Sequence, residues 1–350
     1  MKFSLFTEIQ CPTGASPDIR LNEFLEQAEL ADRLGFYGFW IAEIHCQPRF
    51  SLLSAPYVVL GAVAQRTHHL RLGVAVNTLP IHHPVHLAEQ AAMLDLISEG
   101  RMDFAAGGGH PHSRAYECFG ADHKSTHDIM AEGLEIIRRA WSEDTLNFTG
   151  KFFQIPEVVV NPKPVQKPLP PFYMATSSLE GVEVGARLGI NLLLPIHTRT
   201  PEQVIEFANA YWDGLKEQGH DPATRELGLL VPMHLAPTTA EAKARSEAGI
   251  MSYFKTIADM RVDYTDWLTR RGDELPARLK TAAGATVDFA TICSRHAVIG
   301  SSEVGVQALR DLSQKTGATH FLTWHNIGSV PHPLVGESME QFAREVMPQL

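Results

Sequence analysis

Residues 70–109, LRLGVAVNTLPIHHPVHLAEQAAMLDLISEGRMDFAAGGG, contain a complete strand–helix–strand unit. The run Leu70–Val76 is short and largely apolar, which predicts a buried strand. Pro84 suits a first helical turn, and apolar residues then recur at helical spacing until Gly100 ends the helix. Met102–Ala106 predicts a second strand. Because a helix joins them, we expect the two strands to be parallel.

The same unit recurs along the whole chain. Eight strands are predicted, at Lys2–Thr7, Phe36–Ala42, Leu70–Val76, Met102–Ala106, Phe172–Ala175, Ile190–Leu194, Leu227–Leu235 and Thr319–Trp324. Helical segments separate them, which predicts an α/β fold of the (β/α)8 TIM-barrel type in a single domain, residues 1–350. In such a barrel the carboxyl ends of all strands converge on the face where the active site is built.

Two segments depart from this alternation. Residues 147–171 contain six prolines, which predicts an excursion over the barrel surface. Residues 238–297 follow the seventh strand and contain no predicted strand. An insertion on the carboxyl-end side of a barrel strand would lie over the mouth of the barrel, so this segment is a candidate lid.

Composition excludes several classes of protein. The chain has 30 basic and 40 acidic residues, a net charge of −10, and no basic patch interleaved with aromatic residues, so nucleic acid is not an expected partner. Its four cysteines are scattered without a CxxC pair, which predicts free thiols rather than a disulfide framework or zinc knuckle: Cys11, Cys46, Cys118 and Cys293. The apolar start is too short for a signal peptide, and no later stretch approaches membrane-spanning length. We therefore expect a cytoplasmic protein without a membrane partner.

Residues that could do chemistry follow the predicted strands. Glu43 and His45 follow the second strand, where a carboxylate beside an imidazole suits acid–base chemistry, although such a pair is also often structural. Asn77 follows the third strand. Gly107, Gly108 and Gly109 follow the fourth, where glycines allow close approach of a ligand but also fit an ordinary tight loop.

The fifth strand is followed by Thr176–Glu180, TSSLE, at the predicted start of a helix. Ser177 with Glu180 fits a capping box. A helix N-terminus rich in hydroxyl groups is also an anion site, and barrel enzymes often hold a phosphate there.

Histidine is abundant, with 17 residues. Several lie near predicted strand ends: His82, His83, His110, His112, His197, His234 and His325. The pair His110 and His112 has the form of a hydrolase metal site, but no acidic residue at another strand end completes it. We assign no metal ligand and retain a metal-dependent barrel hydrolase as a lower-ranked alternative.

The chain resembles the bacterial luciferase-like, flavin-dependent monooxygenases over nearly its whole length. The resemblance is carried by GFYGFWIAEIH at 35–45, the segment from 71 to 109, YMATSSLEGVEVGARLGI at 173–190, and the ending SMEQFAREVMPQL at 338–350. It implies a barrel that binds reduced FMN, or in some relatives the deazaflavin F420, at the carboxyl ends of the strands. It also implies a homodimer.

Residue by residue, the resemblance places a non-prolyl cis peptide of the family at Ala75–Val76, against the isoalloxazine ring. Asn77 could bond flavin or substrate, and the family's phosphate loop matches Ser177, Ser178 and the backbone up to Gly181. The expected cofactor-binding residues are Ala75, Val76, Asn77, Gly107, Gly108, Thr176, Ser177, Ser178 and Gly181.

Two positions depart from the family pattern. Luciferases carry Glu-His-His after the second strand, whereas this chain has Glu43-Ile44-His45, so the reaction on long-chain aldehydes is not transferred. The glycine segment also lacks the arginine with which many relatives hold the phosphate, a role that Arg114 or a histidine could take.

We interpret the chain as a monooxygenase that uses reduced FMN and O2 on a small organic substrate, with His45 transferring protons and Glu43 orienting it. The sequence has no GxGxxG unit for a nicotinamide, which predicts a separate flavin reductase as partner. Two further alternatives remain beside the hydrolase. One is an F420- or FMN-dependent oxidoreductase that transfers hydride without oxygen, and the other is a flavin-binding protein that has lost catalysis.

Overall fold

The computed structural model describes residues 1–109, 114–121, 125–274 and 287–350. Eight parallel strands close into a ring, in the spatial order β1, β2, β3, β4, β7, β8, β9 and β11, with β11 paired back to β1. Their bounds are β1 Lys2–Thr7, β2 Gly38–Ile41, β3 Arg71–Thr78, β4 Met102–Gly107, β7 Phe172–Ala175, β8 Asn191–Pro195, β9 Leu227–Leu235 and β11 His320–Trp324. The (β/α)8 barrel is confirmed, and each end of the eight strands lies within two residues of the predicted one.

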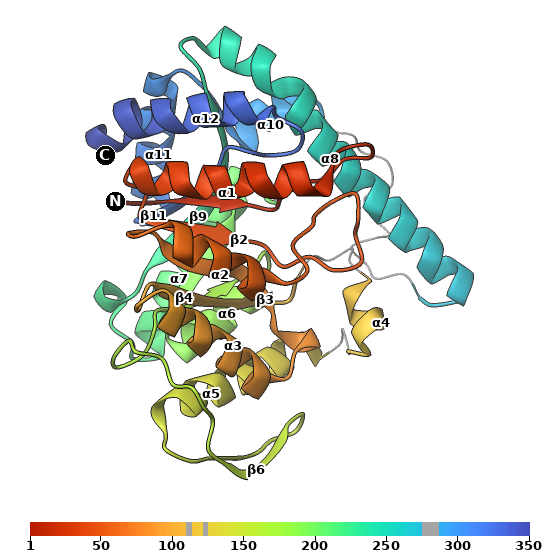
Figure 1. The fold of residues 1–350 in the computed structure, drawn as a ribbon, viewed down its shortest axis with the longest axis vertical. Helices are drawn as coiled ribbons and strands as arrows, with labels where there is room; N and C mark the ends of the chain where they lie inside the picture. The colour runs from red at the N-terminus through yellow and green to blue at the C-terminus, as the bar shows by residue number, and fades with distance from the viewer. Residues whose placement is uncertain (110–113, 122–124, 275–286) are drawn as a thin grey trace.

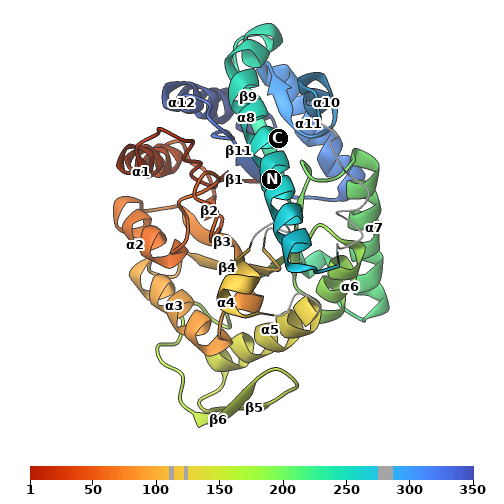
Figure 2. The same cartoon turned by 90° about the vertical axis from the view of Figure 1, so that its right-hand side faces the viewer.

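Helices surround the ring, as Figure 2 shows end-on. The outer helices are α1 Pro17–Arg33, α2 Pro56–Arg66, α3 Pro84–Ile97, α5 Thr126–Ser142, α6 Leu179–Leu188, α7 Pro201–Glu217, α11 Ser302–Thr316 and α12 His332–Gln341. Proline opens several of them, as at Pro84, because its missing N–H is not needed at the first turn. At α7 the predicted start is confirmed, since Thr200 and Gln203 form a reciprocal capping box.

The remaining elements lie outside the alternation. They are α4 Ala115–Phe119, the hairpin β5 Leu146–Thr149 with β6 Gln154–Val158, α8 Thr239–Arg271, α10 Phe289–Arg295 and β10 Val298–Gly300. The hairpin lies outside the barrel, at the foot of Figure 1. Short helical turns are Leu79–Ile81, Pro222–Thr224, Phe342–Val346 and Met347–Gln349. The sequence did not predict the hairpin or β10, which extends the sheet beside the end of β9.

The barrel interior is filled by large side chains. Trp40 lies fully buried against Gly73 of the neighbouring strand, where an added Cβ would come within 2.3 Å of the indole ring. On the next strands round the ring, Phe6 of β1 and Trp324 of β11 pack edge to face with their ring centroids 5.3 Å apart. The barrel is therefore a packed core rather than a channel.

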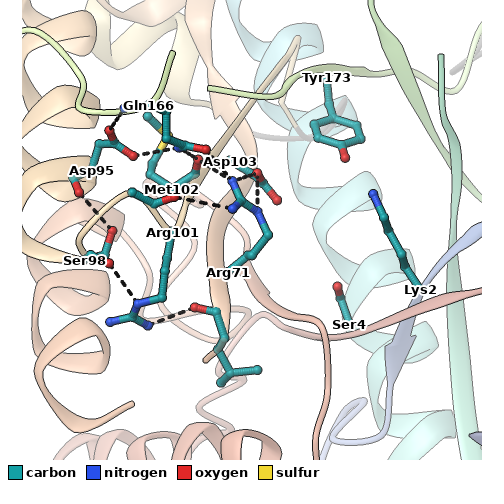
Figure 3. Close-up of polar contacts among 12 residues, drawn as sticks. Lys2, Ser4, Arg71, Asp95, Ser98, Arg101, Met102, Asp103, Gln166 and Tyr173 are labelled. Carbon is teal, nitrogen blue, oxygen red and sulfur yellow. Dashed lines mark hydrogen bonds and ion pairs between the residues drawn. The ribbon is translucent and has the colours of Figure 1, made fainter. Parts of the chain in front are cut away.

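The amino end of the barrel is closed by polar side chains, most of which Figure 3 shows. Asp103 accepts hydrogen bonds from Arg71 at 2.8 and 2.5 Å. Glu226 accepts from Lys2 at 2.9 Å and from the Tyr173 hydroxyl at 3.0 Å. Burial raises the pKa of Asp103 to about 6 despite its arginine partner. This cluster ties together the amino ends of the strands.

None of the helices within the four described ranges has both the length and the apolar composition that a membrane span requires.

Candidate active site

Among the described residues, one side of the barrel mouth carries small, partly exposed residues. At the ends of β3 and β7 the small residues Ala75 and Ala175 are partly exposed, and Gly108 is partly exposed after β4. At the ends of β1 and β11, by contrast, Ile9 and Trp324 are buried. Small side chains on one side of the mouth provide a shallow surface against which a flat molecule could lie.

The end of β3 is irregular. The Ala75–Val76 peptide bond is cis, as the resemblance implies, and the pairing of β3 with β4 shifts register between Val74 and Asn77. The Asn77 side chain is buried and donates from Nδ2 to the carbonyl oxygen of Ala105, 2.8 Å away. Asn77 is therefore held against β4 beneath the rim.

Glu43 is the centre of a polar network next to this rim. Its Oε1 atom lies 3.1 Å from Nε2 of His45 and 2.6 Å from Nε2 of His82, while the backbone N–H of Thr78 donates to Oε2 at 2.5 Å. Burial favours the neutral carboxyl, but the hydrogen bonds from both histidines and Thr78 outweigh burial and lower the pKa of Glu43 to about 2. Glu43 is thus a buried carboxylate that orients two imidazoles.

Glu43, His45 and His82 also present one possible metal-ligand atom each, all within 4.8 Å of one another. Among the described residues, these three form the one cluster of possible metal ligands. The sequence suggested a different pair, His110 and His112. His110 and His112 lie outside the described residues.

The glycine segment after β4 is shaped by its neighbours. A Cβ on Gly107 would come within 2.6 Å of Val76, so the glycine permits the close approach of β3 and β4. The Tyr116 hydroxyl of α4 donates to the carbonyl oxygen of Gly108 at 2.8 Å. A small hollow beside it is lined by Glu43, Ile44, His45, Thr78, Gly109, Ala115 and Tyr116.

The serine segment opens α6, with one correction to the predicted cap. Ser178, and not Ser177, is the N-cap, and its hydroxyl accepts from the backbone N–H of Gly181 at 3.2 Å. The capping box of Ser177 with Glu180 is wrong, because the helix begins one residue later and its third position is Gly181, which has no side chain to return the bond. The Thr176 hydroxyl stabilises the turn by accepting a hydrogen bond from the backbone N–H of Ser178 at 3.1 Å.

Arg199, which no sequence pattern indicated, reaches this segment from the loop after β8. Its Nε donates to the carbonyl oxygen of Ser177 at 2.7 Å, and a terminal nitrogen donates to the same oxygen. Burial lowers the pKa of Arg199, and no carboxylate of the described residues forms an ion pair with it. Arg114, by contrast, stacks on the Trp267 ring of α8 at 4.6 Å. The guanidinium beside the serines is therefore that of Arg199.

Other strand-end residues are buried away from the open side. Burial raises the pKa of Glu8 to about 8, although Gln10 donates to it at 2.8 Å. Burial lowers the pKa of His234 to about 4 and that of His325 to about 3. His325 lies 5.5 Å from the Phe342 ring, so it belongs to the layer between barrel and outer helices. A strand end thus does not by itself place a side chain in the mouth.

Helix α8 runs across the barrel mouth (Figures 1 and 2). Tyr253 of α8 packs on Trp324 at 4.9 Å, and Tyr264 donates to Glu117 of α4 at 3.3 Å. A hollow of about 350 Å³ lies between α8 and the segment after β2. Its lining residues are Cys46, Gln47, Pro48, Arg49, Phe50, Arg114, Thr256, Met260, Asp263, Asp266, Trp267 and Arg270.

The donor set fits a phosphate-bearing aromatic coenzyme. The first N–H groups of the ten-residue helix α6, the Ser178 hydroxyl and the Arg199 guanidinium together suit a phosphate dianion. Ala75 and Ala175 provide small apolar contacts for a flat ring system nearby.

Comparison with known proteins agrees with this chemistry. A family model described as luciferase-like monooxygenase matches residues 1–320. The oxygenase component of a flavin-dependent trigonelline monooxygenase from Acinetobacter baylyi is 30% identical over 260 residues, which cover 73% of this chain and 71% of that protein.

Two solved structures share the fold at 18% identity. The FMN complex of the oxygenating constituent of 3,6-diketocamphane monooxygenase from Pseudomonas putida superposes with a TM-score of 0.81, covering 100% of this chain and 98% of the other. An F420-dependent secondary alcohol dehydrogenase superposes with a TM-score of 0.75, covering 99% and 98%.

Proposed function

The chain belongs to the luciferase-like monooxygenase family, and from this premise we propose that it uses reduced FMN and O2 to oxygenate a small organic substrate. When bound, reduced flavin would supply the electrons and the site of oxygen activation. The observation that carries the proposal is the meeting of the Ser178 helix cap, the Arg199 guanidinium and the shallow rim at Ala75 and Ala175.

The phosphate of FMN would be held at the start of α6. Ser177, Ser178 and the N-terminal N–H groups of α6 would donate to its oxygens, and Arg199 would balance its charge. Arg199 thereby supplies the cation that the glycine segment lacks. Thr176 and Gly181 would shape the turn, since a Cβ on Gly181 would come within 2.1 Å of the Thr176 hydroxyl.

Acid–base chemistry would be carried out by His45. If Nε2–H is donated to Glu43, the basic lone pair of the ring is on Nδ1, which is the atom that would take and return a proton. Glu43 stays ionised and fixes that tautomer. His82 bonds the same carboxylate oxygen, so it is proposed as a second imidazole near the position where Ile44 interrupts the family pattern.

Helix α8, within the 238–297 insertion, is proposed as the lid. The contacts of Tyr253 and Tyr264 support this role, because they join α8 to the end of β11 and to α4 on two sides of the mouth. A closed mouth would keep water from the reacting groups.

Two partners are proposed. A separate reductase would supply reduced FMN. This is supported by the similar protein from Acinetobacter baylyi, which is named as the oxygenase component of its monooxygenase. A homodimer is supported by α2 and α3, whose outer faces carry exposed large apolar side chains: Val58, Met93, Leu96 and Ile97.

The ranked alternatives keep the same site. An F420- or FMN-dependent hydride transfer without oxygen is supported by the fold shared with the F420-dependent dehydrogenase. A metal-dependent hydrolase would use Glu43, His45 and His82. Metal analysis of the purified protein and titration with F420 separate these alternatives from the flavin monooxygenase.

The cofactor proposal is tested with FMN and riboflavin, which lacks the phosphate. We expect Arg199→Gln to weaken FMN binding by about 10- to 100-fold, the value of one or two charge-assisted hydrogen bonds, and to leave riboflavin binding unchanged. Ser178→Ala should also weaken FMN binding and leave riboflavin binding unchanged. Thr238→Ala is the control, because it removes an equivalent cap from α8 and should leave FMN binding unchanged. Equal losses for FMN and riboflavin would contradict the phosphate site.

The reaction is tested with chemically reduced FMN under O2 labelled with oxygen-18. The first substrates are trigonelline and limonene, because similar proteins are a trigonelline monooxygenase and a limonene 1,2-monooxygenase. The proposal expects one labelled oxygen atom in the product. Oxidation of substrate without label would favour hydride transfer.

A further inference from the structure

Two of the four cysteines, separated by 72 positions in sequence, meet beside the candidate active site. The Sγ atoms of Cys46 and Cys118 are 3.1 Å apart, and both thiols are free and exposed. Cys46 directly follows His45, and Cys118 lies on α4. The sequence predicts scattered free thiols, and the fold brings these two into contact.

The contact is close to the geometry of a covalent bond. A disulfide has an S–S distance of about 2.0 Å, so the two sulfur atoms need to approach by about 1 Å. Their exposure gives a small oxidant direct access. The other cysteines lack this arrangement, because Cys11 is buried with its thiol against the Ala15 carbonyl oxygen, and Cys293 is on α10.

We propose that Cys46 and Cys118 are a redox-active pair that forms a reversible intramolecular disulfide, with hydrogen peroxide as the oxidant. One thiolate attacks the peroxide, breaking the O–O bond to give a sulfenic acid and water. The second thiol attacks that sulfur, forms the S–S bond and releases a second water. Two thiols thus give two electrons and two protons to one peroxide.

Either thiol can make the first attack, because both are exposed to the oxidant. The other thiol, 3.1 Å away, is then the resolving thiol.

The bond would fasten α4 to the segment that carries His45. The Phe119 ring, next to Cys118, already packs edge to face on His45 at 5.0 Å. Glu117 of the same helix accepts from Tyr264 of α8. Oxidation would therefore join the segment after β2, α4 and α8 more rigidly around one side of the mouth.

The test treats the full-length protein, first reduced and freed of reductant, with hydrogen peroxide. We expect thiol titration of the denatured protein to fall from four thiols to two, a mass loss of about 2 Da, and full recovery with dithiothreitol. Trypsin without reduction should yield peptides 34–49 and 115–124 joined to each other.

Matched variants separate this pair from general oxidation. Cys293→Ser should leave the linked peptides unchanged, whereas Cys46→Ser should abolish them and leave a sulfenic acid on Cys118 that dimedone traps. Four unchanged thiols, links through Cys11 or Cys293, or links between two chains would overturn the proposal. None of these measurements requires flavin or turnover, so the result is independent of the proposed function.

Discussion

Glu43 shows how a single buried carboxylate can organise a site. It receives hydrogen bonds from residues on two different strand ends, His45 after β2 and His82 after β3. The sequence indicates Glu43 and His45 because they are adjacent to one strand. His82 lies 39 positions from Glu43, and the parallel pairing of β2 with β3 brings the two together.

This network predicts unequal effects of its histidines. We expect His45→Ala to lower the oxygenation kcat by about 10²- to 10⁴-fold, the usual contribution of a general acid or base, with the Kd for reduced FMN unchanged. His82→Gln should lower kcat less and shift the pH profile of kcat, because it removes one of the bonds that hold Glu43. The neighbouring His83→Gln is the control, since the His83 ring packs on Phe153 instead. An unaltered pH profile in His82→Gln would show that His82 is only structural.

Glu8 predicts a pH dependence of stability. Its pKa is about 8 in the folded protein, well above that of an exposed glutamate, so between about pH 4.5 and 8 the folded state keeps a proton that the unfolded state loses. The free energy of unfolding should therefore fall as pH rises through this window. Glu8→Gln should flatten this slope in urea titrations at several pH values, whereas Glu157→Gln on the exposed strand β6 should keep it. The same slope in wild type and Glu8→Gln would contradict the raised pKa.

Arg199 and Ser178 mark the limit of residue-level prediction. The serine run after a predicted strand indicates an anion site, but the exact cap depends on where the backbone turns, and that is one residue later than expected. Arg199 belongs to the next strand–helix loop, so its approach to Ser177 is a tertiary contact that spacing does not encode.

At the scale of elements, the barrel strands were predictable because each is a short apolar run between helices. The hairpin β5–β6 was not predictable, because the five-residue strand β6 contains a proline and exposed polar residues. Helix α8 was expected only as helical and mixed segments, yet it is a single helix of 33 residues.

The seating of α8 depends on a glycine. A Cβ on Gly249 would come within 2.5 Å of the backbone nitrogen of Val330, in the loop after β11. We expect Gly249→Ala to lower the free energy of unfolding by about 1–3 kcal/mol, as overpacking does, and to speed hydrogen exchange in α8. Gly61→Ala is the control, because Gly61 of α2 has open space at this position and alanine favours a helix. Equal effects of the two substitutions would show that Gly249 does not seat α8.

At the scale of the whole molecule, the barrel could be predicted, and with it the face on which the site is expected, because parallel strands put all carboxyl ends on one face. The sequence could not predict which side of the carboxyl-end face is open, because this depends on which side chains fill the mouth. Large rings from β1, β11 and α8 occupy one side, and small residues of β3 and β7 remain on the other.

The proposed homodimer gives a prediction at this scale. Val58 of α2 is 76% exposed, and Leu96 of the neighbouring helix α3 is 39% exposed. We expect the double substitution Val58→Lys/Leu96→Lys to convert a dimer to a monomer in light scattering, because charges would be buried at the apolar contact. Val304→Lys on α11, a residue exposed to the same extent as Leu96, should leave the assembly unchanged. A wild-type monomer would contradict the dimer itself.

The polar cluster at the amino end of the barrel has a consequence for how ligands bind and dissociate. The barrel interior is packed, and Arg71, Asp103 and Glu226 close its amino end, so a molecule bound at the carboxyl-end face would have to enter and leave on that same face. If flavin lies against Ala75 and Ala175 as proposed, a substrate stacked above it would have to dissociate first, so the two would bind and be released in a fixed order.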